Sequence, residues 1–257
     1  MSETVSSNTK PVDVIIPLST GSRSNNDELR ICFRSIAKHA LDIGKIILVT
    51  TEPPAWLSDA VNVLAIPDTG AHNKDANIIN KVISALKHYN IVDDFVFFSD
   101  DQCLLKDINL RELPPVYNNR SKDIFVNAKK ANNWTRRVVN TFNFLEKQGI
   151  YLPHNYESHT PQRYNAEKLL ATIEGIDYKK LPGFTINTLF MGMLGVTGGV
   201  RQSEVKVTYE DERQYTTLTT DLPFCGYNDK GFLSGLRDIL FDKFNQPSIY
   251  EQPLQVS

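Results

Sequence analysis

Apolar and polar segments alternate along the first half of the chain in a pattern typical of strands and helices that follow one another in turn. Short apolar runs rich in β-branched residues predict strands at residues 12–18, 45–51, 61–66 and 94–98. Apolar positions three and four residues apart predict amphipathic helices that begin at Asp27 and Asp75 and end near Gly44 and Tyr89. This alternation predicts an α/β fold with a mostly parallel central sheet flanked by helices.

The second half has a looser pattern, which predicts an elaboration of this core. We expect a strand at residues 123–128 and helices at 134–148, 165–173 and 231–244. The sequence has no internal repeat and no segment with the composition of a linker. It therefore predicts a single domain over residues 11–250, preceded by a disordered polar tail at residues 1–10.

Composition narrows the class of protein. Of the 257 residues, 41% are hydrophobic and 23% are charged, which is ordinary for a globular protein that builds its core without disulfides. A net charge of −2 excludes a uniformly basic protein that coats nucleic acid. The three cysteines are far apart, and no apolar run is as long as a membrane span. We therefore expect a cytoplasmic protein with no membrane association.

Two adjacent carboxylates follow the strand at residues 94–98. In open α/β sheets ligands bind beyond the carboxyl ends of the strands, which is where this strand delivers Asp100 and Asp101. Neighbouring carboxylates repel each other, and a Mg²⁺ or Mn²⁺ ion that carries a diphosphate compensates both charges. The pair is therefore a candidate metal site; the alternatives are a solvated turn, or Asp101 as the cap of a short helix.

The loop after the first strand is a second candidate for ligand binding. Ser19, Thr20, Gly21 and Ser22 supply small side chains and main-chain donors at a strand end. The loop has neither the lysine of a P-loop nor the spacing of a dinucleotide-binding motif, so a simple turn remains the alternative.

A basic segment occupies residues 120–147 of this near-neutral chain. It holds seven Lys or Arg residues against two acids, a local charge of +5. With its interleaved amides and Trp134, the segment is a candidate track for a nucleic-acid backbone or for an anionic saccharide. The alternative is a solvated amphipathic helix with Trp134 in the core. The basic residues are Arg120, Lys122, Lys129, Lys130, Arg136, Arg137 and Lys147.

Several ordered blocks resemble the Stealth-type sugar transferases. They are DELRICFRSI at 27–36, KIILVT at 45–50, PAWL at 54–57, FFSDD at 97–101, HTPQR at 159–163 and FCGYND at 224–229. The first block departs from that family, because PLSTGS at 17–22 stands where the family has Thr-Trp-Val-Asp-Gly. In this block, in its short length and in NKDANI at 73–78, the chain is more similar to small glycosyltransferase-like proteins of tailed bacteriophages.

The resemblance implies a GT-A type transferase that uses a nucleotide-diphosphate sugar, with a UDP-linked donor expected. It implies a Mg²⁺ or Mn²⁺ ion held by Asp101, Asp100 and His159, which would neutralise charge on the departing diphosphate. The implied donor contacts are Pro17, Leu18, Ser19, Thr20, Gly21, Arg30, Asp68, His72, Asn73, Lys74 and Asp100. The alternative for Arg30 is a surface ion pair with Asp27, and the residues at 68–74 are equally compatible with an ordinary loop.

The resemblance also implies catalytic residues, and the basic segment supplies acceptor candidates. Asp101, His159 and Asp229 are the catalytic candidates, with Asp229 as the general base that deprotonates the acceptor hydroxyl. Asp229 is also a candidate N-cap of the C-terminal helix. The acceptor candidates are Lys129, Lys130, Trp134, Arg136, Arg137, His154 and Arg163.

The function that these residues lead us to expect is transfer of a sugar to the hydroxymethyl group of a modified pyrimidine in double-stranded phage DNA, in the host cytoplasm. One alternative is a Stealth-like sugar-1-phosphate transferase that acts on a saccharide. A second alternative is an inactive accessory protein that binds nucleotide or DNA. The sugar, the nucleotide, the stereochemical outcome and the oligomeric state are left open.

Overall fold

The computed structural model describes residues 10–20, 22–70, 73–118, 132–201, 206–207 and 223–253, with only the main chain of 206–207. Residues 1–9 of the expected tail at 1–10 and the expected strand at 123–128 therefore lie outside the described residues. The elements are β1 (Val12–Pro17), α1 (Asp27–His39), β2 (Ile43–Val49), β3 (Val61–Leu64), α2 (Lys74–His88), β4 (Asp94–Phe97), β5 (Gln102–Leu104), a 3₁₀ turn (Leu110–Glu112), β6 (Val116–Tyr117), α4 (Asn133–Lys147), β7 (Gln162–Asn165), α5 (Ala166–Ile173), α6 (Ile186–Met193), β8 (Val200–Arg201), β9 (Lys206–Val207), β10 (Phe224–Tyr227), α8 (Asp229–Gly231), a π-helical turn (Phe232–Leu236) and α9 (Arg237–Lys243).

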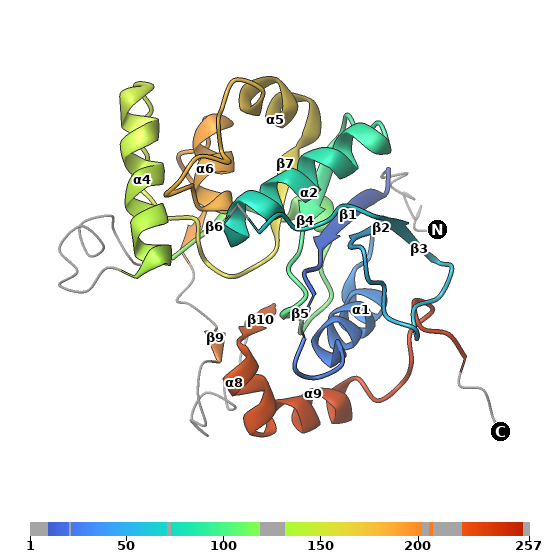
Figure 1. Cartoon of the computed structure of the whole chain (residues 1–257). Helices are drawn as coiled ribbons and strands as arrows, with labels where there is room; N and C mark the ends of the chain where they lie inside the picture. The colour runs from blue at the N-terminus through green and yellow to red at the C-terminus, as the bar shows by residue number, and fades with distance from the viewer. Residues whose placement is uncertain are drawn as a thin grey trace, which may run out of the picture.

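A five-stranded sheet in the order β3-β2-β1-β4-β7 forms the centre of the molecule (Figure 1). Strands β1 to β4 are parallel, and β7 pairs antiparallel with β4. The chain runs outward from β1 through β2 to β3 and then returns to place β4 on the other side of β1. The strand order thus reverses between β1 and β4, the kind of position at which open α/β sheets bind ligands. The predicted α/β fold with a mainly parallel sheet is confirmed.

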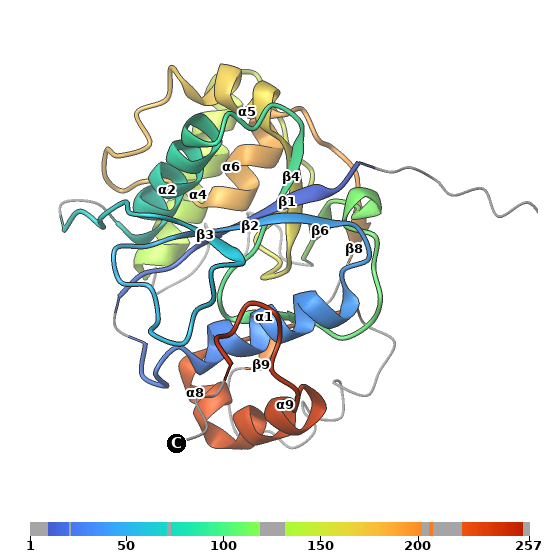
Figure 2. The same ribbon diagram turned by 90° about the vertical axis from the view of Figure 1, so that its right-hand side faces the viewer.

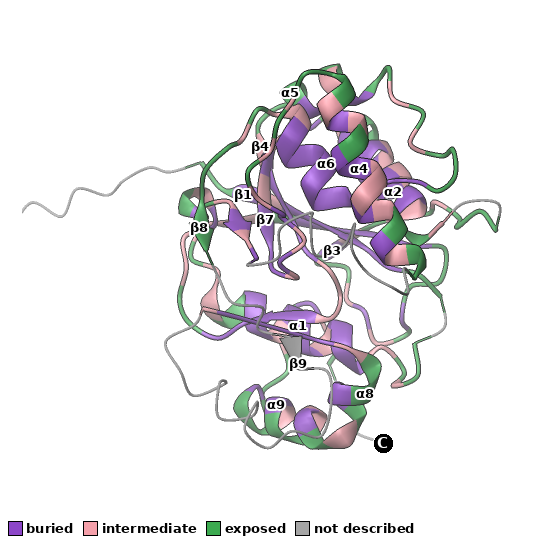
Figure 3. Cartoon of the chain, turned by 90° about the vertical axis from the view of Figure 1, so that its left-hand side faces the viewer, coloured by how far each residue is buried: buried purple, intermediate pink, exposed green. Residues whose placement is uncertain are grey.

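Helices cover both faces of the sheet. Successive strand residues point to opposite faces, so Ile15 and Ile47 pack with α2, α5 and α6, whereas Ile16 and Leu48 pack with α1. Figure 2 shows α2, α4, α5 and α6 on one side of the sheet and α1, α8 and α9 on the other. The helix faces turned toward the sheet are buried in Figure 3.

Helix α1 ends before Gly44, so the predicted end of this helix is wrong. The helix stops at His39, and Gly44 lies inside β2. A Cβ atom at Gly44 would come within 2.5 Å of the Asp13 carboxylate on β1. The glycine therefore permits close approach of two strands and does not terminate a helix. By contrast, the helix predicted from Asp75 to Tyr89 is observed within one residue at each end, as α2.

The predicted C-terminal helix at 231–244 is broken into α8, a π-helical turn and α9, so that prediction is wrong in detail. Gly235, with φ of 114°, interrupts the helical backbone. Phe232, Leu236 and Leu240 are nevertheless buried in one cluster, which explains why the apolar spacing indicated one helix. The N-cap is Asn228, whose side chain accepts a hydrogen bond from the Gly231 N–H, so the predicted cap role of Asp229 is also wrong.

A small second sheet, in the order β5-β10-β9, packs near the sheet's carboxyl edge. Strand β5 follows the acid pair directly, and β10 pairs antiparallel with it. Within the part of the chain that the structure describes, no helix combines the length and the apolar character that a bilayer crossing requires.

Candidate functional site

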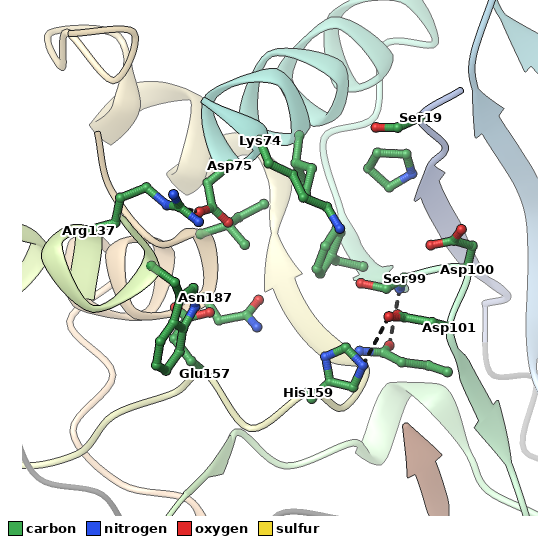
Figure 4. Close-up of a pocket in the computed structure, with 16 residues that line it drawn as sticks. Ser19, Lys74, Asp75, Ser99, Asp100, Asp101, Arg137, Glu157, His159 and Asn187 are labelled. Atoms are coloured by element: carbon green, nitrogen blue, oxygen red, sulfur yellow. Dashed lines mark hydrogen bonds and ion pairs between the residues drawn. The ribbon is translucent and has the colours of Figure 1, made fainter. Parts of the chain in front are cut away.

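A cavity of about 410 Å³ lies at the carboxyl ends of β1 and β4, where the strand order reverses (Figure 4). Pro17 and Ser19 reach it from the end of β1, and Ser99 reaches it from the turn after β4. Helices α2, α4 and α6 supply the opposite wall. A volume of several hundred Å³ is in the range of small-molecule sites. Of the residues expected from the sequence, the cavity collects Pro17, Ser19, Lys74, Asp100, Asp101, Trp134, Arg137 and His159.

Asp100 and Asp101 form the acidic end of the cavity. They occupy the short turn between β4 and β5, in which the Ser99 N–H donates to the Gln102 side chain at 3.1 Å. Burial and the neighbouring charge of Asp101 raise the pKa of Asp100 to about 7, and Lys74 opposes this rise. Positive charge therefore balances the two carboxyl groups only in part, and a bound cation would stabilise their ionised forms.

His159 faces the acid pair from the segment before β7. Its Nε2 is buried and lies 3.3 Å from Asp101 Oδ2 (Figure 4). The histidine has φ of 55°, in the left-handed region that few non-glycine residues adopt. Gly226 on β10 backs the ring so closely that a Cβ atom there would come within 2.2 Å of His159 Cδ2. Strand β10 also fixes the acid turn, because the Tyr227 N–H donates to the Asp101 carbonyl at 3.1 Å.

The first turn of α2 faces the acid pair from across the cavity. Asn73 caps this helix by accepting a hydrogen bond from the Ala76 N–H at 3.0 Å, and Lys74 and Asp75 both line the cavity. A helix N-terminus carries a partial positive charge, to which Lys74 adds a full one. This side of the cavity therefore suits an anionic group.

The other end of the cavity holds a second group of polar side chains, of which only Arg137 was expected from the sequence. Arg137 on α4 donates through Nε to the carboxylate of Asp75. Burial raises the pKa of Asp75, although Arg137 opposes this rise. Glu157 accepts a hydrogen bond from the Thr188 N–H at 2.8 Å, at the start of α6. Burial raises the pKa of Glu157 to about 7, with the nearby charge of Asp75 adding to the rise.

Asn187 and Trp134 complete this end. The Tyr164 hydroxyl donates to Asn187 Oδ1 at 2.8 Å, which orients the amide. Trp134 lies in the first turn of α4 and presents an indole to the cavity. Asp75, Glu157 and Asn187 were not predicted, because none lies in a motif and tertiary packing alone brings them together.

Three expected donor residues are engaged outside the cavity. Arg30 lies over the Trp56 ring at 4.7 Å and pairs with Glu251 at 3.5 Å and Asp27 at 3.8 Å. Asp68 pairs with buried Lys81 at 2.7 Å. The Leu18 carbonyl accepts a hydrogen bond from the same Lys81 at 2.7 Å. Thr20 is exposed in the loop, while Gly21 and His72 lie outside the described residues.

The remaining expected catalytic and acceptor residues either lie apart from the cavity or fall outside the described residues. Asp229 is exposed and lies 3.7 Å from Arg23. Arg163 pairs with Asp94, at the opposite end of β4 from the acid pair, and His154 stacks on Tyr117. Arg136 is exposed on α4, and Lys129 and Lys130 lie outside the described residues.

The donor set at the acid pair is that of a hard cation. Among the described residues, no group of three His, Cys, Asp or Glu side chains stands in a metal-binding arrangement. Magnesium commonly takes one or two carboxylates and completes its shell with water and substrate phosphates. Asp100 and Asp101 fit such a cation, and His159 lies beside Asp101.

Comparison with protein-family models and with curated proteins finds no match for this chain. The functional assignment therefore rests on the geometry of the cavity and on the sequence blocks.

Proposed function

We propose that this protein is a metal-dependent GT-A type glycosyltransferase that transfers a sugar from a nucleotide diphosphate, UDP being the expected nucleotide, to a hydroxyl group. The observation that carries the proposal is the position of Asp100 and Asp101 in the cavity at the reversal of strand order, opposite Lys74 and the α2 N-terminus. Two carboxylates that share a cavity with a lysine and a helix N-terminus match a divalent cation bound to a diphosphate.

The reaction exchanges one bond to the anomeric carbon for another. The acceptor hydroxyl oxygen attacks that carbon and its proton passes to water, while the bond between the carbon and the diphosphate oxygen breaks and the bonding electrons leave with the nucleoside diphosphate. Mg²⁺ or Mn²⁺ would neutralise charge on the departing diphosphate when bound. Asp100 and Asp101 would hold the cation, Lys74 would pair with phosphate oxygens, and His159 would orient Asp101. Asp229 is not retained as the base, because it lies at the surface beside Arg23.

The acceptor that we propose is the hydroxymethyl group of a modified pyrimidine in double-stranded DNA. Arg136 is exposed in the first turn of α4, next to Arg137 and close to Trp134, which both line the cavity, whereas Lys147 is exposed at the other end of the helix. Exposed cations beside a cavity can hold a phosphate backbone and leave a base to reach the site. Arg137 contributes less than a full positive charge to a binding surface for the DNA backbone, because it pairs with Asp75.

The test is incubation of the protein with Mn²⁺, a panel of nucleotide sugars, and DNA with or without hydroxymethylated pyrimidines. We expect a mass gain of one sugar on the modified nucleoside, release of nucleoside diphosphate, and no gain with EDTA or with Asp101→Asn. Release of nucleoside monophosphate would instead indicate sugar-1-phosphate transfer. Consumption of the nucleotide sugar without a mass gain on any DNA would indicate a saccharide acceptor. If no nucleotide sugar is consumed with any acceptor, the proposal of a transferase is refuted.

A further inference from the structure

The cavity has a second polar end, distinct from the acid pair, which the proposed metal and diphosphate leave unused. Figure 4 shows Asp75, Arg137, Glu157 and Asn187 on one side of Lys74, and Ser99, Asp100 and Asp101 on the other. Apolar contacts come from Ile78 and Ile186, and Trp134 adds an aromatic surface. Hydrogen-bonding groups of both kinds beside an aromatic plane suit a ring that has polar edges and an apolar face.

Each polar group at this end is oriented by a protein partner and keeps bonding capacity for a ligand. Arg137 uses Nε for Asp75, so its pairing leaves the Nη groups for other acceptors. Asn187 has Oδ1 occupied by Tyr164, which leaves its amide N–H groups as donors. Glu157 accepts from the Thr188 N–H through Oε1 and also interacts with the Thr188 and Thr185 hydroxyls, and a carboxylate has about four acceptor sites. The site therefore offers fixed donors and fixed acceptors.

We propose that this end of the cavity binds the transferred sugar of the donor, and that this sugar is a neutral hexose and not a uronic acid. The inference rests on the proposed function, which positions the diphosphate at Asp100 and Asp101. Carboxylates accept from sugar hydroxyls, Arg137 and Asn187 donate to them, and the Trp134 indole packs on the apolar face of the ring.

Charge excludes the uronic acid. Two carboxyl groups, Asp75 and Glu157, line this end of the cavity together with one guanidinium, that of Arg137, which pairs with Asp75. The charge of Asp75 is close enough to Glu157 to contribute to its raised pKa. A sugar carboxylate added here would lose its water and meet two carboxyl groups, while Arg137 already shares its charge with Asp75 and the diphosphate takes Lys74. A hydroxymethyl group in the same position meets no such repulsion.

Calorimetry with matched ligands tests the inference. UDP, UDP-glucose, UDP-galactose, UDP-glucuronate and UDP-galacturonate are titrated into the full chain with Mn²⁺. We expect at least one hexose donor to bind about tenfold or more tighter than UDP, since two or three hydrogen bonds are added. Each uronate should bind at least about tenfold more weakly than its matching hexose. Equal affinity for UDP and both hexose donors, or for hexose and uronate, would overturn the inference; no binding of UDP would overturn the proposed function itself.

Variants locate the subsite. Trp134→Ala should abolish most of the affinity that the hexose adds to UDP, Trp134→Phe should retain it, and Tyr151→Ala, which removes an aromatic ring that is 75% exposed, should change nothing. Glu157→Gln should narrow the preference for hexose over uronate, whereas Glu174→Gln at an exposed position should not. These ratios compare ligands on one variant, so a change in folding stability cancels. Unchanged ratios in both Trp134→Ala and Glu157→Gln would refute the assignment.

Discussion

Two main-chain features hold the His159 ring against Asp101. The left-handed φ of His159 costs about 1–2 kcal/mol for a residue with a Cβ, a cost that the surrounding packing must offset. The missing side chain of Gly226 leaves the space that the ring occupies. The close packing of Gly226 leaves the ring little room to turn away from Asp101, which favours a function for the 3.3 Å contact.

Gly226→Ala tests this positioning. The new methyl group would overlap His159 Cδ2 and the His159 carbonyl, so His159 must shift relative to β10 and its contact with Asp101 changes. We expect transfer activity to fall by about tenfold or more, equivalent to about 1.4 kcal/mol in the barrier. Gly175→Ala, with open space around it, serves as the control and should keep full activity. Parental kinetics in a folded Gly226→Ala protein would show that the His159 position has no role in the reaction.

The carboxyl of Glu157 should make stability depend on pH. Its pKa of about 7 lies above the ordinary value of 4.5, so between these values the folded protein binds a proton that the unfolded chain has released. Its contribution to the free energy of unfolding therefore falls as pH rises from about 4.5 to 7 and stays low above pH 7.

Thermal melts of Glu157→Gln and of the parent at pH 5 and pH 8 test this effect. The variant should gain stability relative to the parent on going from pH 5 to pH 8, because only the parent has a carboxyl group at position 157 to ionise. Glu174→Gln, at an exposed site, should show no such change. A Tm difference between Glu157→Gln and the parent that is the same at both pH values would contradict the raised pKa.

At the scale of elements, buried Lys81 on α2 ties together two loops at the carboxyl edge of the sheet. Its Nζ donates to the Leu18 carbonyl after β1 and pairs with Asp68 after β3, both at 2.7 Å. The sequence pattern assigned Asp68 to the donor and gave Lys81 no role, since a lysine within a helix is ordinarily a surface residue. Because Lys81 bonds the carbonyl of Leu18, it fixes the start of the loop that carries Ser19.

Lys81→Met should therefore destabilise the protein and weaken nucleotide binding together. Removing one partner leaves the Leu18 carbonyl and Asp68 unpaired, at a cost of about 3 kcal/mol, the lower end for a buried pair because Asp68 is partly exposed. Urea denaturation measures this loss, and calorimetry measures the affinity for UDP. Lys87→Met, at an exposed position on the same helix, should leave both unchanged. A parental free energy of unfolding for Lys81→Met would contradict this role.

Elements with a strong local period were predictable from sequence, and those defined by their partners were not. Strands β1, β2 and β4 are buried apolar runs, and α2 has a clear amphipathic stripe. Strand β7 reads Gln-Arg-Tyr-Asn and becomes a strand only because β4 offers it an edge. No element was predicted for the apolar segment that forms α6, because a short helix buried on most sides has no polar stripe to reveal its period.

The same distinction separates the two ends of the cavity. Asp100 and Asp101 were found because they follow an obvious strand, and the strand direction fixes where they lie. Glu157 and Asn187 come from an irregular segment and a buried helix, so only tertiary packing brings them to Arg137 and Asp75. Arg163 was assigned to the acceptor, although the strand β7 that directs it toward Asp94 could not be recognised from its sequence.

At the scale of the whole molecule, strand order accounts for the location of the site. The reversal between β1 and β4 opens a crevice at their carboxyl ends, and each of the surrounding elements α2, α4, α6 and the β5-β10 pair contributes to or supports one wall. The net charge of −2 hides this organisation, because two cations, Lys74 and Arg137, and an acidic turn line the same cavity. The fold thus brings a cation site, an anion site and a polar subsite into one crevice.

The most direct test of this account is calorimetric titration of UDP into the full chain, with Mn²⁺ and with EDTA, for the parent and for Asp101→Asn. We expect the parent to bind UDP only when Mn²⁺ is present, and Asp101→Asn, which keeps the shape of the turn after β4, to retain its Tm and lose at least about tenfold in affinity. Binding of UDP that is equally tight in EDTA and in Asp101→Asn, or no binding to the parent with Mn²⁺, would contradict the assignment of the acid pair as the metal-diphosphate site.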